Sequence, residues 1–362
     1  HGSGPDMGAY ESSYEGIIGC TDYLALNFNP DAWIEGECFY ASEWYVATSG
    51  DDVEGLGTDE SPFASIQHAL AFITNISQEE NNELQTIYVE NGTYYENISW
   101  PALGNIQLIG EDRDSTIVNG NDTGIVIDMT SLNGIEDFGT LISHLTITNG
   151  YTSGGEGGGL RISGSPTLQY LNIVGNHAYH GGGMALYFSN PILNHLTITG
   201  NTATASGGIL LYHSNPTLNN VIITNNTVMG DGEWEGFGGG MALVHSKPTL
   251  NNVTISENTA NEGGGMHLTD YNPFGEPSAP IIHNSIIWGN TAESIFITNS
   301  GTPLVNYSDI QGGWEGEGNI DDDPLFVNVE NGDFSLQNSS PCTDSGNPNL
   351  WYNDTDGTSS DM

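Results

Sequence analysis

The chain has 362 residues, a net charge of −43 and three basic residues, Arg113, Arg161 and Lys247. Such an acidic surface repels nucleic acid and anionic lipid headgroups, which excludes both as partners. No apolar run reaches the roughly 18 residues of a membrane-spanning helix, so membrane insertion is not expected. The same surface attracts divalent cations and tolerates salt, which predicts an extracellular or cell-surface location.

The N-terminal part divides into two short pieces. Residues 1–14 form a separate segment, and residues 15–42 form a small module bracketed by two cysteines. We expect Cys20 and Cys38 to form a disulfide in an oxidising compartment. Cys342 is left over, either as a buried free thiol or as a cross-link between subunits.

One helix is predicted, over Ser61–Ile73. Ser61 is a suitable N-cap and Pro62 suits the first helical position, and apolar residues follow at positions 63, 66, 69, 70 and 73. We expect this helix to cover the open N-terminal end of the structure that follows, where an unpaired strand edge would invite aggregation.

A repeat dominates the rest of the chain. Its copies begin at Pro166, Pro191, Pro216, Pro248 and Pro280, which lie 25, 25, 32 and 32 residues apart, and each has an Asn ten residues after its Pro. A degenerate copy begins at Pro303. The copies read as short Val/Ile/Thr-rich strands between turns, and a period of about 25 residues predicts one turn of a parallel β-helix.

Equivalent positions in successive turns should stack into ladders. Two apolar ladders are expected to face inward: Leu168, Leu193, Leu218, Leu250 and Ile282, and Ile173, Ile198, Ile223, Ile255 and Ile287. An Asn ladder is expected at a turn, with the asparagines in the left-handed region and their amides bonded to neighbouring turns: Asn176, Asn201, Asn226, Asn258 and Asn290. Glycine runs such as Gly181–Gly183 predict a corner that needs positive φ.

The predicted fold class is therefore all-β: a right-handed parallel β-helix solenoid over residues 43–318, with a short N-terminal capping helix and small end modules. Residues 319–362 would close the C-terminal end. The two 32-residue spacings leave room for loops around Gly230–Gly236 and Tyr271–Pro277 that do not disturb the core.

Three stretches resemble known proteins: YVATSGDDVEGLGTDESPFASIQHAL at 45–70, NISWPALGNIQLIGEDRDSTIVNG at 97–120 and NYSDIQGGWEGEGNIDDDPLFVN at 306–328. They resemble right-handed parallel β-helix repeat proteins of the pectate-lyase-like superfamily, of the secreted multi-module type found in marine and Bacteroidetes-like bacteria. That superfamily includes lyases, hydrolases, adhesins and structural proteins, so the resemblance implies the fold rather than a function.

Catalytic constellations are sparse. A uronate lyase on this fold needs a basic proton abstractor and further cations, and the three basic residues show no clustering in the sequence. A glycosidase needs paired carboxylates, and the strands of the repeats carry almost no Asp. We therefore assign no catalytic residue, and the sequence favours a protein that is not an enzyme without deciding the question.

Part of one short sequence motif occurs at both ends of the chain. Residues 6–11 read DMGAYE, and the chain ends in DM at Asp361 and Met362. Either the chain is one period of a longer tandem, or the head of one subunit docks on its neighbour's tail, or the ends are an arbitrary cut. The predicted self-association residues are Asp6, Met7, Gly8, Ala9, Tyr10, Asp361 and Met362.

Ligand sites are predicted from acidic and aromatic residues. Carboxylates that could hold a structural Ca²⁺, or that are solvated turn acids, are Asp321, Asp322, Asp323, Asp354, Asp356 and Asp361. Aromatic residues that could bind glycans, or fold back over their own turn, are Trp234, Phe237, Tyr271, Phe274 and Trp314. Candidate glycosylation sites are Asn75, Asn91, Asn97, Asn121, Asn225, Asn252, Asn306, Asn338 and Asn353.

The function expected from the sequence is that of a non-catalytic extracellular structural or adhesive protein. It would associate head to tail with copies of itself, as a filament or a cell-surface array. The alternative is a β-helix protein that binds or degrades a neutral polysaccharide.

Overall fold

The computed structural model describes residues 16–23, 25–76, 83–135, 139–230, 236–270, 276–349 and 360–362. It divides into two compact units, residues 1–43 and residues 44–362. In the first unit, β1 (Ile18–Gly19) and β2 (Ile34–Glu35) form a two-stranded parallel sheet. Among the described residues no helix is long and apolar enough to cross a bilayer.

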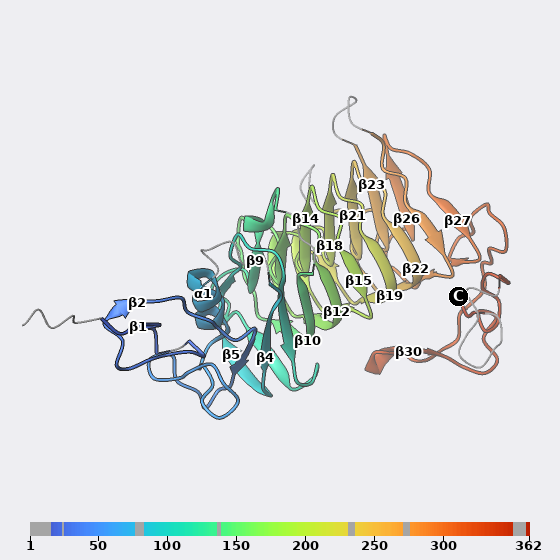
Figure 1. Ribbon diagram of the computed structural model, residues 1–362. Coiled ribbons are helices and arrows are strands. Elements are labelled where there is room, and N and C mark those ends of the chain that lie inside the picture. Colours follow the sequence, from blue (N-terminus) through green and yellow to red (C-terminus); the bar gives the residue numbers. More distant parts are fainter. Residues whose placement is uncertain are drawn as a thin grey trace, which may run out of the picture. The chain divides into compact units, whose positions relative to one another are not determined.

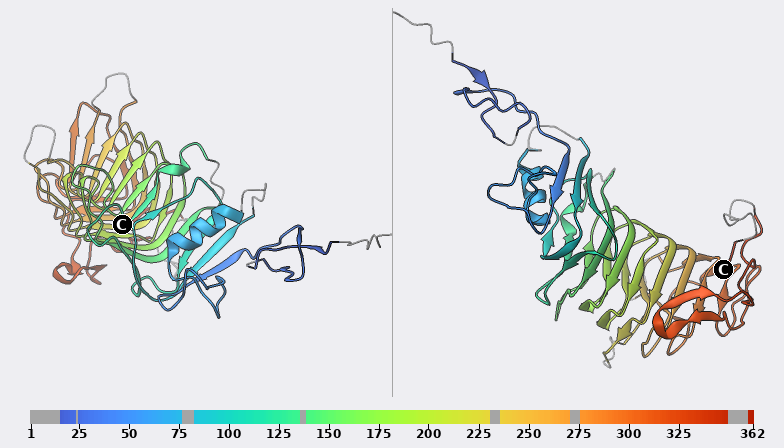
Figure 2. Two further views of the ribbon diagram at one scale, coloured as in Figure 1. Left: turned by 90° about the vertical axis from the view of Figure 1, so that its left-hand side faces the viewer. Right: turned by 90° about the horizontal axis from the view of Figure 1, so that it is seen from below.

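The second unit is a parallel β-helix, in which successive turns of the chain stack on one another (Figures 1 and 2). Two long sheets form its sides, in the part of the chain that the structure describes. The main sheet contains β3 (Glu43–Val46), β4 (Gln85–Val89), β5 (Gly92–Tyr95), β7 (Ile106–Gly110), β8 (Thr116–Asn119), β10 (Leu141–Thr148), β12 (Thr167–Val174), β15 (Ile192–Asn194), β16 (Thr197–Thr199), β19 (Thr217–Thr224), β22 (Thr249–Ser256), β24 (Ile281–His283), β25 (Ile286–Trp288), β27 (Leu304–Asn306) and β28 (Asp309–Ile310).

The second sheet contains β6 (Ile98–Ser99), β9 (Ile127–Met129), β11 (Leu160–Ile162), β14 (Met184–Tyr187), β18 (Ile209–Tyr212), β21 (Met241–Val244), β23 (Met266–Thr269) and β26 (Ile295–Thr298). A narrow third sheet contains β13 (His177–His180), β17 (Thr202–Ala205) and β20 (Thr227–Val228). An antiparallel pair of strands follows the β-helix, formed by β29 (Phe326–Asn328) and β30 (Asp333–Leu336). Two short 3₁₀ helices lie at Thr130–Leu132 and Val329–Asn331. The predicted parallel β-helix is confirmed.

The repeat sets the register of the strands. Leu168 pairs with Leu193, Leu193 with Leu218, and Leu218 with Leu250, and the isoleucine ladder pairs in the same way. Members of both apolar ladders are fully buried. Since one repeat makes one turn, each apolar side chain lies above its equivalent and the core is continuous along the helix.

The asparagine ladder is also present, and its amides do bond from turn to turn. Asn226 Nδ2 donates to Asn258 Oδ1 at 2.9 Å, and Asn201 Nδ2 donates to Asn226 Oδ1 at 3.0 Å. The predicted left-handed conformation of these asparagines is wrong, because positive φ falls on the preceding residue, such as Gly200 (65°) or Asn225 (55°). The residue before the ladder makes the turn, which leaves the Asn side chain pointing inward.

Another ladder occupies the left-handed region along the main sheet, five residues before that turn. Its residues have φ between 48° and 57°: His144, Tyr170, His195, Asn220, Asn252, Asn284 and Tyr307. The glycine runs do supply positive φ at their first position, for example Gly181 (63°) and Gly263 (62°). Later glycines of each run make room for the next turn, since a Cβ on Gly239 would lie 2.4 Å from the carbonyl oxygen of Gly264.

The helix α1 spans Ile66–Ile76, so the predicted start at Ser61 is wrong. Phe63 pairs with Val46 as an extended residue, which keeps the preceding segment out of the helix. Ser65 takes the capping position instead, and its Oγ accepts a hydrogen bond from the backbone N–H of His68 at 3.2 Å. The carboxylate of Glu96 accepts hydrogen bonds from the N–H groups of Ile66 and Gln67.

Candidate functional site

A cleft of about 250 Å³ lies on the outer face of the second sheet. Strand pairing places one outward-facing residue of each turn in a single column: Asp128, Arg161, Ala185, Leu210, Ala242, His267 and Phe296. Side chains alternate along a strand, so the column two residues further on also faces outward. That second column includes Tyr187, Tyr212, Val244 and Thr269.

The floor of the cleft is apolar. Ala185, Leu210, Ala242 and Val244 form a buried cluster on the outer face of the sheet, and Tyr187 and Tyr212 pack against it. Small side chains at Ala242 and Val244, between larger neighbours, leave the hollow. An apolar floor with a few polar groups around it is the usual composition of a ligand site.

Aromatic rings and polar groups form the walls. The rings of Tyr187 and Tyr212 lie 5.7 Å apart, and the ring of Phe237 stacks on that of His267 at 4.8 Å. Glu156, His180 and Ser206 also line the cleft. The walls therefore combine flat apolar surfaces with hydrogen-bonding groups.

Two buried polar atoms in this cleft have no hydrogen-bond partner among the described residues: Tyr187 Oη and His267 Nδ1. His267 is 2% exposed, and its other ring nitrogen, Nε2, lies 3.2 Å from Thr298 Oγ1. Burial lowers the pKa of His267 to about 4, so its ring is neutral at pH 7. Buried polar atoms are normally paired, and two unpaired ones in one cleft point to a ligand that offers hydrogen bonds.

Charged groups lie toward one end of the cleft. Arg161 donates to Asp128 at 2.5 Å, and this pairing holds the pKa of Asp128 below its ordinary value although burial opposes it. Glu156 lies near Tyr187 Oη without meeting the geometry of a hydrogen bond. Burial, followed by the nearby Glu156 carboxylate, raises the pKa of Tyr187. The arginine charge is thus already balanced within the protein.

The other basic residues also have acidic partners, Arg113 with Asp114 and Lys247 with Glu276. Of the aromatic candidates from the sequence, Phe237 lines the cleft, and Trp314 lines a separate open hollow beside β26. Trp234, Tyr271 and Phe274 lie outside the described residues.

Sequence reasoning missed Tyr187, Tyr212 and His267. A signal for the tyrosines was present, because each ends the strand that follows a glycine run, in GGGMALY and GGILLY. His267 occupies the matching strand in GGGMHLT, but without a structure its ring could not be assigned to the outer face.

Three of the four predicted calcium ligands that the structure describes accept hydrogen bonds from backbone N–H groups. Asp321 Oδ1 accepts from the N–H of Gly312, Asp323 Oδ1 from Leu325, and Asp361 Oδ1 from Asp344. Asp322 donates its own N–H to Asp309 Oδ1. Asp354 and Asp356 lie outside the described residues, and within those residues no group of three or more His, Cys, Asp or Glu is arranged to hold a metal. The calcium site stays a prediction.

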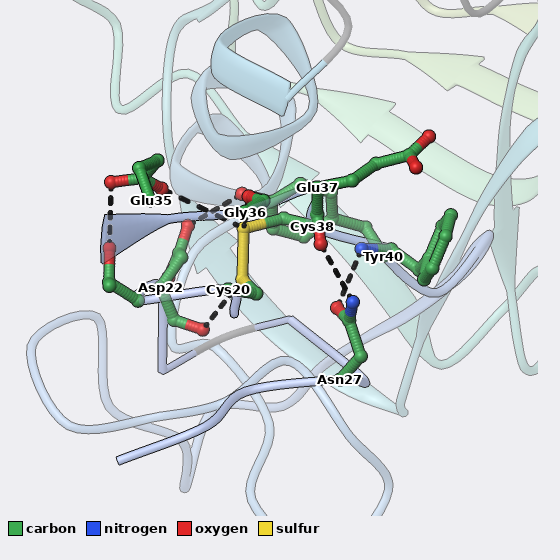
Figure 3. Close-up of a disulfide and its surroundings, with 10 residues drawn as sticks. Cys20, Asp22, Asn27, Glu35, Gly36, Glu37, Cys38 and Tyr40 are labelled. Carbon is green, nitrogen blue, oxygen red and sulfur yellow. Dashed lines mark hydrogen bonds between the residues drawn. A yellow bond between two sulfur atoms is a disulfide. The ribbon is translucent and has the colours of Figure 1, made fainter. Parts of the chain in front are cut away.

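The disulfide between Cys20 and Cys38 is present in the first unit, with the Cα atoms 4.9 Å apart (Figure 3). Cys342 is a buried free thiol and donates to Asp309 Oδ2 at 3.2 Å. Met362 is 8% exposed and packs with Cys342 and Ile286 of its own chain, whereas residues 6–10 lie outside the described part.

The glycosylation candidates are exposed at Asn75, Asn91, Asn97, Asn121, Asn225 and Asn338, and half-buried at Asn252 and Asn306. Asn353 lies outside the described residues. Their modification stays a prediction.

The family described as right-handed β-helix region matches residues 76–271, slightly more than half of the chain. No curated protein matches this chain. Similar solved structures include the pectin methylesterase from carrot, 15% identical over 76% of this chain and 82% of that one, with a TM-score of 0.46. Pectin methylesterase PemA from Erwinia chrysanthemi is 12% identical over 81% of this chain and 98% of that one (TM-score 0.47). Pectate lyase Pel9A is 13% identical over 86% of this chain and 94% of that one (TM-score 0.43).

Proposed function

The chain belongs to the right-handed β-helix family, and on this fold we propose that it binds an uncharged polysaccharide in the cleft over β18 and β21. The observation that carries the proposal is the combination of an apolar floor with two buried polar atoms, Tyr187 Oη and His267 Nδ1, that have no hydrogen-bond partner among the described residues.

A sugar ring matches this chemistry. Its C–H faces can pack on Tyr187, Tyr212 and the alanine–leucine floor, and its hydroxyls can both donate and accept hydrogen bonds. Neutral His267 accepts or donates at Nδ1 according to its tautomer, and a hydroxyl satisfies either state. A cleft of about 250 Å³ encloses a small group, so the rest of a polymer would remain in solvent.

Charge favours an uncharged ligand. The net charge of −43 opposes the approach of a polyuronate, and Arg161, the basic residue near the cleft, is already paired with Asp128. An anionic sugar would therefore find no available cation there.

Binding without bond cleavage accounts best for the residues present. Among the described residues that line the cleft, Glu156 is the one carboxylate. Glycoside hydrolysis ordinarily uses two carboxyl groups on opposite sides of the scissile bond. The Cys20–Cys38 disulfide supports an extracellular setting for such a binding protein.

The experiment is a titration of the full chain with a panel of soluble glucans, mannans, xylans and polyuronates, followed calorimetrically. We expect binding to at least one uncharged polymer and none to polyuronate. Tyr187→Phe, which removes one hydroxyl, should weaken binding about 3- to 10-fold, and Tyr212→Ala should weaken it more than 10-fold.

The matched control is Tyr95→Phe, because Tyr95 is 68% exposed and does not line the cleft. It should bind as the unaltered chain does. No binding to any uncharged polymer, or equal binding by the two tyrosine variants and the control, would reject the proposal. Reducing ends released from the bound polymer, and lost in Glu156→Gln, would instead show an enzyme.

A further inference from the structure

The two long sheets of the β-helix have four ends, and three of them are sealed within the described residues. At β3, the N–H of Phe63 donates to Tyr45 O and the N–H of Ala47 donates to Phe63 O, both at 2.9 Å. At β6, the Gln67 side chain accepts from Ser99 N–H at 2.7 Å and donates to Ser99 O at 3.3 Å. These hydrogen bonds pair backbone groups that would otherwise be free at the edge of each sheet.

At the C-terminal end of the main sheet, β27 is sealed in the same manner. Asn319 Nδ2 donates to Val305 O at 3.0 Å, and the N–H of Tyr307 donates to Glu317 O at 2.7 Å. The loop that follows β28 thus folds back and occupies the edge of the main sheet.

The fourth end, β26, differs. It pairs only with β23, and in the described part of the chain none of its backbone groups bonds to a later residue. All four residues of β26 are half-exposed, whereas Met266 and Leu268, one turn earlier, are fully buried. A hollow of about 370 Å³, lined by Ile295, Ile310 and Trp314 among others, lies beside this edge. Among the residues that the structure describes, none therefore closes the apolar core at this point.

The first unit exposes apolar side chains. Those with large exposed fractions include Ile17 (48%), Ile18 (68%), Leu26 (74%), Trp33 (60%), Ile34 (44%) and Phe39 (54%). In the described residues the backbone bonds of β2 go to β1 and to the adjoining Ile17, and none is made from its other edge. Clustered exposed apolar side chains mark surfaces that bind a partner.

We propose that β26 of one copy receives the N-terminal unit of a second copy, with β2 added beside it as a further strand. An open strand edge is satisfied by another strand, and the partner must also cover Ile295 and Ile297 with apolar side chains. The N-terminal unit offers both features, and both surfaces belong to the same chain. Because the two surfaces differ, the contact is heterologous, and contacts of this kind that do not close into a ring repeat from copy to copy as a filament.

This inference is independent of glycan binding and assigns the head-to-tail contact to new residues. The contact is driven by apolar burial against charge repulsion, since residues 16–43 contain five acidic and no basic residues, and Glu293 and Glu315 are exposed near β26. Salt screens such repulsion, so assembly should strengthen between 0.05 and 0.5 M NaCl.

Sedimentation velocity of the full chain tests the proposal with two complementary variants. Ile18→Asp disables the head surface and Ile297→Asp disables the tail surface, so each alone should remain monomeric. Mixed in equal amounts, they should give a dimer and nothing larger, because one intact head meets one intact tail. The unaltered chain should form a series of larger species at 0.5 M NaCl.

The control is Val53→Asp, which places the same charge at a side chain that is 82% exposed and belongs to neither surface. It should assemble as the unaltered chain does. Ile18 is 68% exposed, so its substitution does not threaten folding even if Ile297→Asp does. An unaltered chain that stays monomeric in both salts, an Ile18→Asp chain that still assembles, or a mixture that gives no dimer would overturn the proposal.

Discussion

The asparagine ladder gives the sharpest test of how the β-helix is held together. Asn226 is fully buried, and its side chain makes four hydrogen bonds. Oδ1 accepts from the backbone N–H and from Nδ2 of Asn201, each at 3.0 Å, and Nδ2 donates to Ile198 O and Asn258 Oδ1, each at 2.9 Å. Asn226→Ala removes all four bonds and leaves the N–H of Asn201 without this acceptor.

The cost follows from the number of bonds. At ~1 kcal/mol for each buried hydrogen bond, the variant should lose about 4 kcal/mol of unfolding free energy, well above the typical effect of a point substitution. Asn194→Ala is the matched control, because Asn194 is half-buried on the outer face and accepts one bond, from Asn219 Nδ2 at 2.9 Å. It should lose at most about 1 kcal/mol.

Urea unfolding followed by circular dichroism measures both variants against the unaltered chain. Equal denaturant dependence in all three makes the differences in midpoint a measure of stability. If Asn226→Ala loses no more than Asn194→Ala, the ladder does not carry the stability assigned to it and the reasoning fails.

Three further predictions concern Asp309, the disulfide and two glycines. Burial, the largest influence, raises the pKa of Asp309 to about 6, above its ordinary 3.8, so the free energy of unfolding should fall as pH rises through that interval. Asp309→Asn should remove this fall. Between pH 4.5 and pH 8 the fall is worth on the order of 2 kcal/mol, and urea midpoints at the two pH values measure it. Replacing Cys20 and Cys38 by Ser should speed proteolysis of the first unit, because it removes a loop constraint worth about 3 kcal/mol. Unfolding of the β-helix should be unchanged, because the disulfide lies in the other compact unit; a shifted urea midpoint of the β-helix would contradict this. Gly263→Ala places a Cβ 2.5 Å from a backbone carbonyl oxygen at a residue with positive φ, whereas Gly200→Ala places one in open space at a similar φ. Thermal unfolding should show a loss of stability of about 1–2 kcal/mol for Gly200→Ala, from the backbone conformation alone, and a larger loss for Gly263→Ala. Equal losses would show that the close contact at Gly263 costs nothing.

The sequence by itself determined the solenoid. A period that returns Pro, Leu, Ile and Asn to the same places predicts stacked turns, since each turn needs only its neighbours to bury its apolar side chains. The repeat spacing alone is enough to pair Leu218 with Leu250 and to join the amides of Asn201 and Asn226.

Local signals were less reliable where a distant strand competed for the same residues. Ser61 and Pro62 have the chemistry of a helix start, yet pairing of Phe63 with Val46 holds this segment extended and moves the start of α1 to Ile66. The position of positive φ, one residue before each ladder Asn, depends on which side chain must face the core.

The tertiary structure alone decided the sites. Tyr187, Phe237 and His267 lie up to 80 residues apart in the sequence and meet because equivalent strands stack with their outward faces aligned. The cleft comes from small side chains at Ala242 and Val244, and the open edge at β26 from a closing loop that returns to the main sheet. Both depend on what lies beside a residue in space, which a repeat pattern does not record.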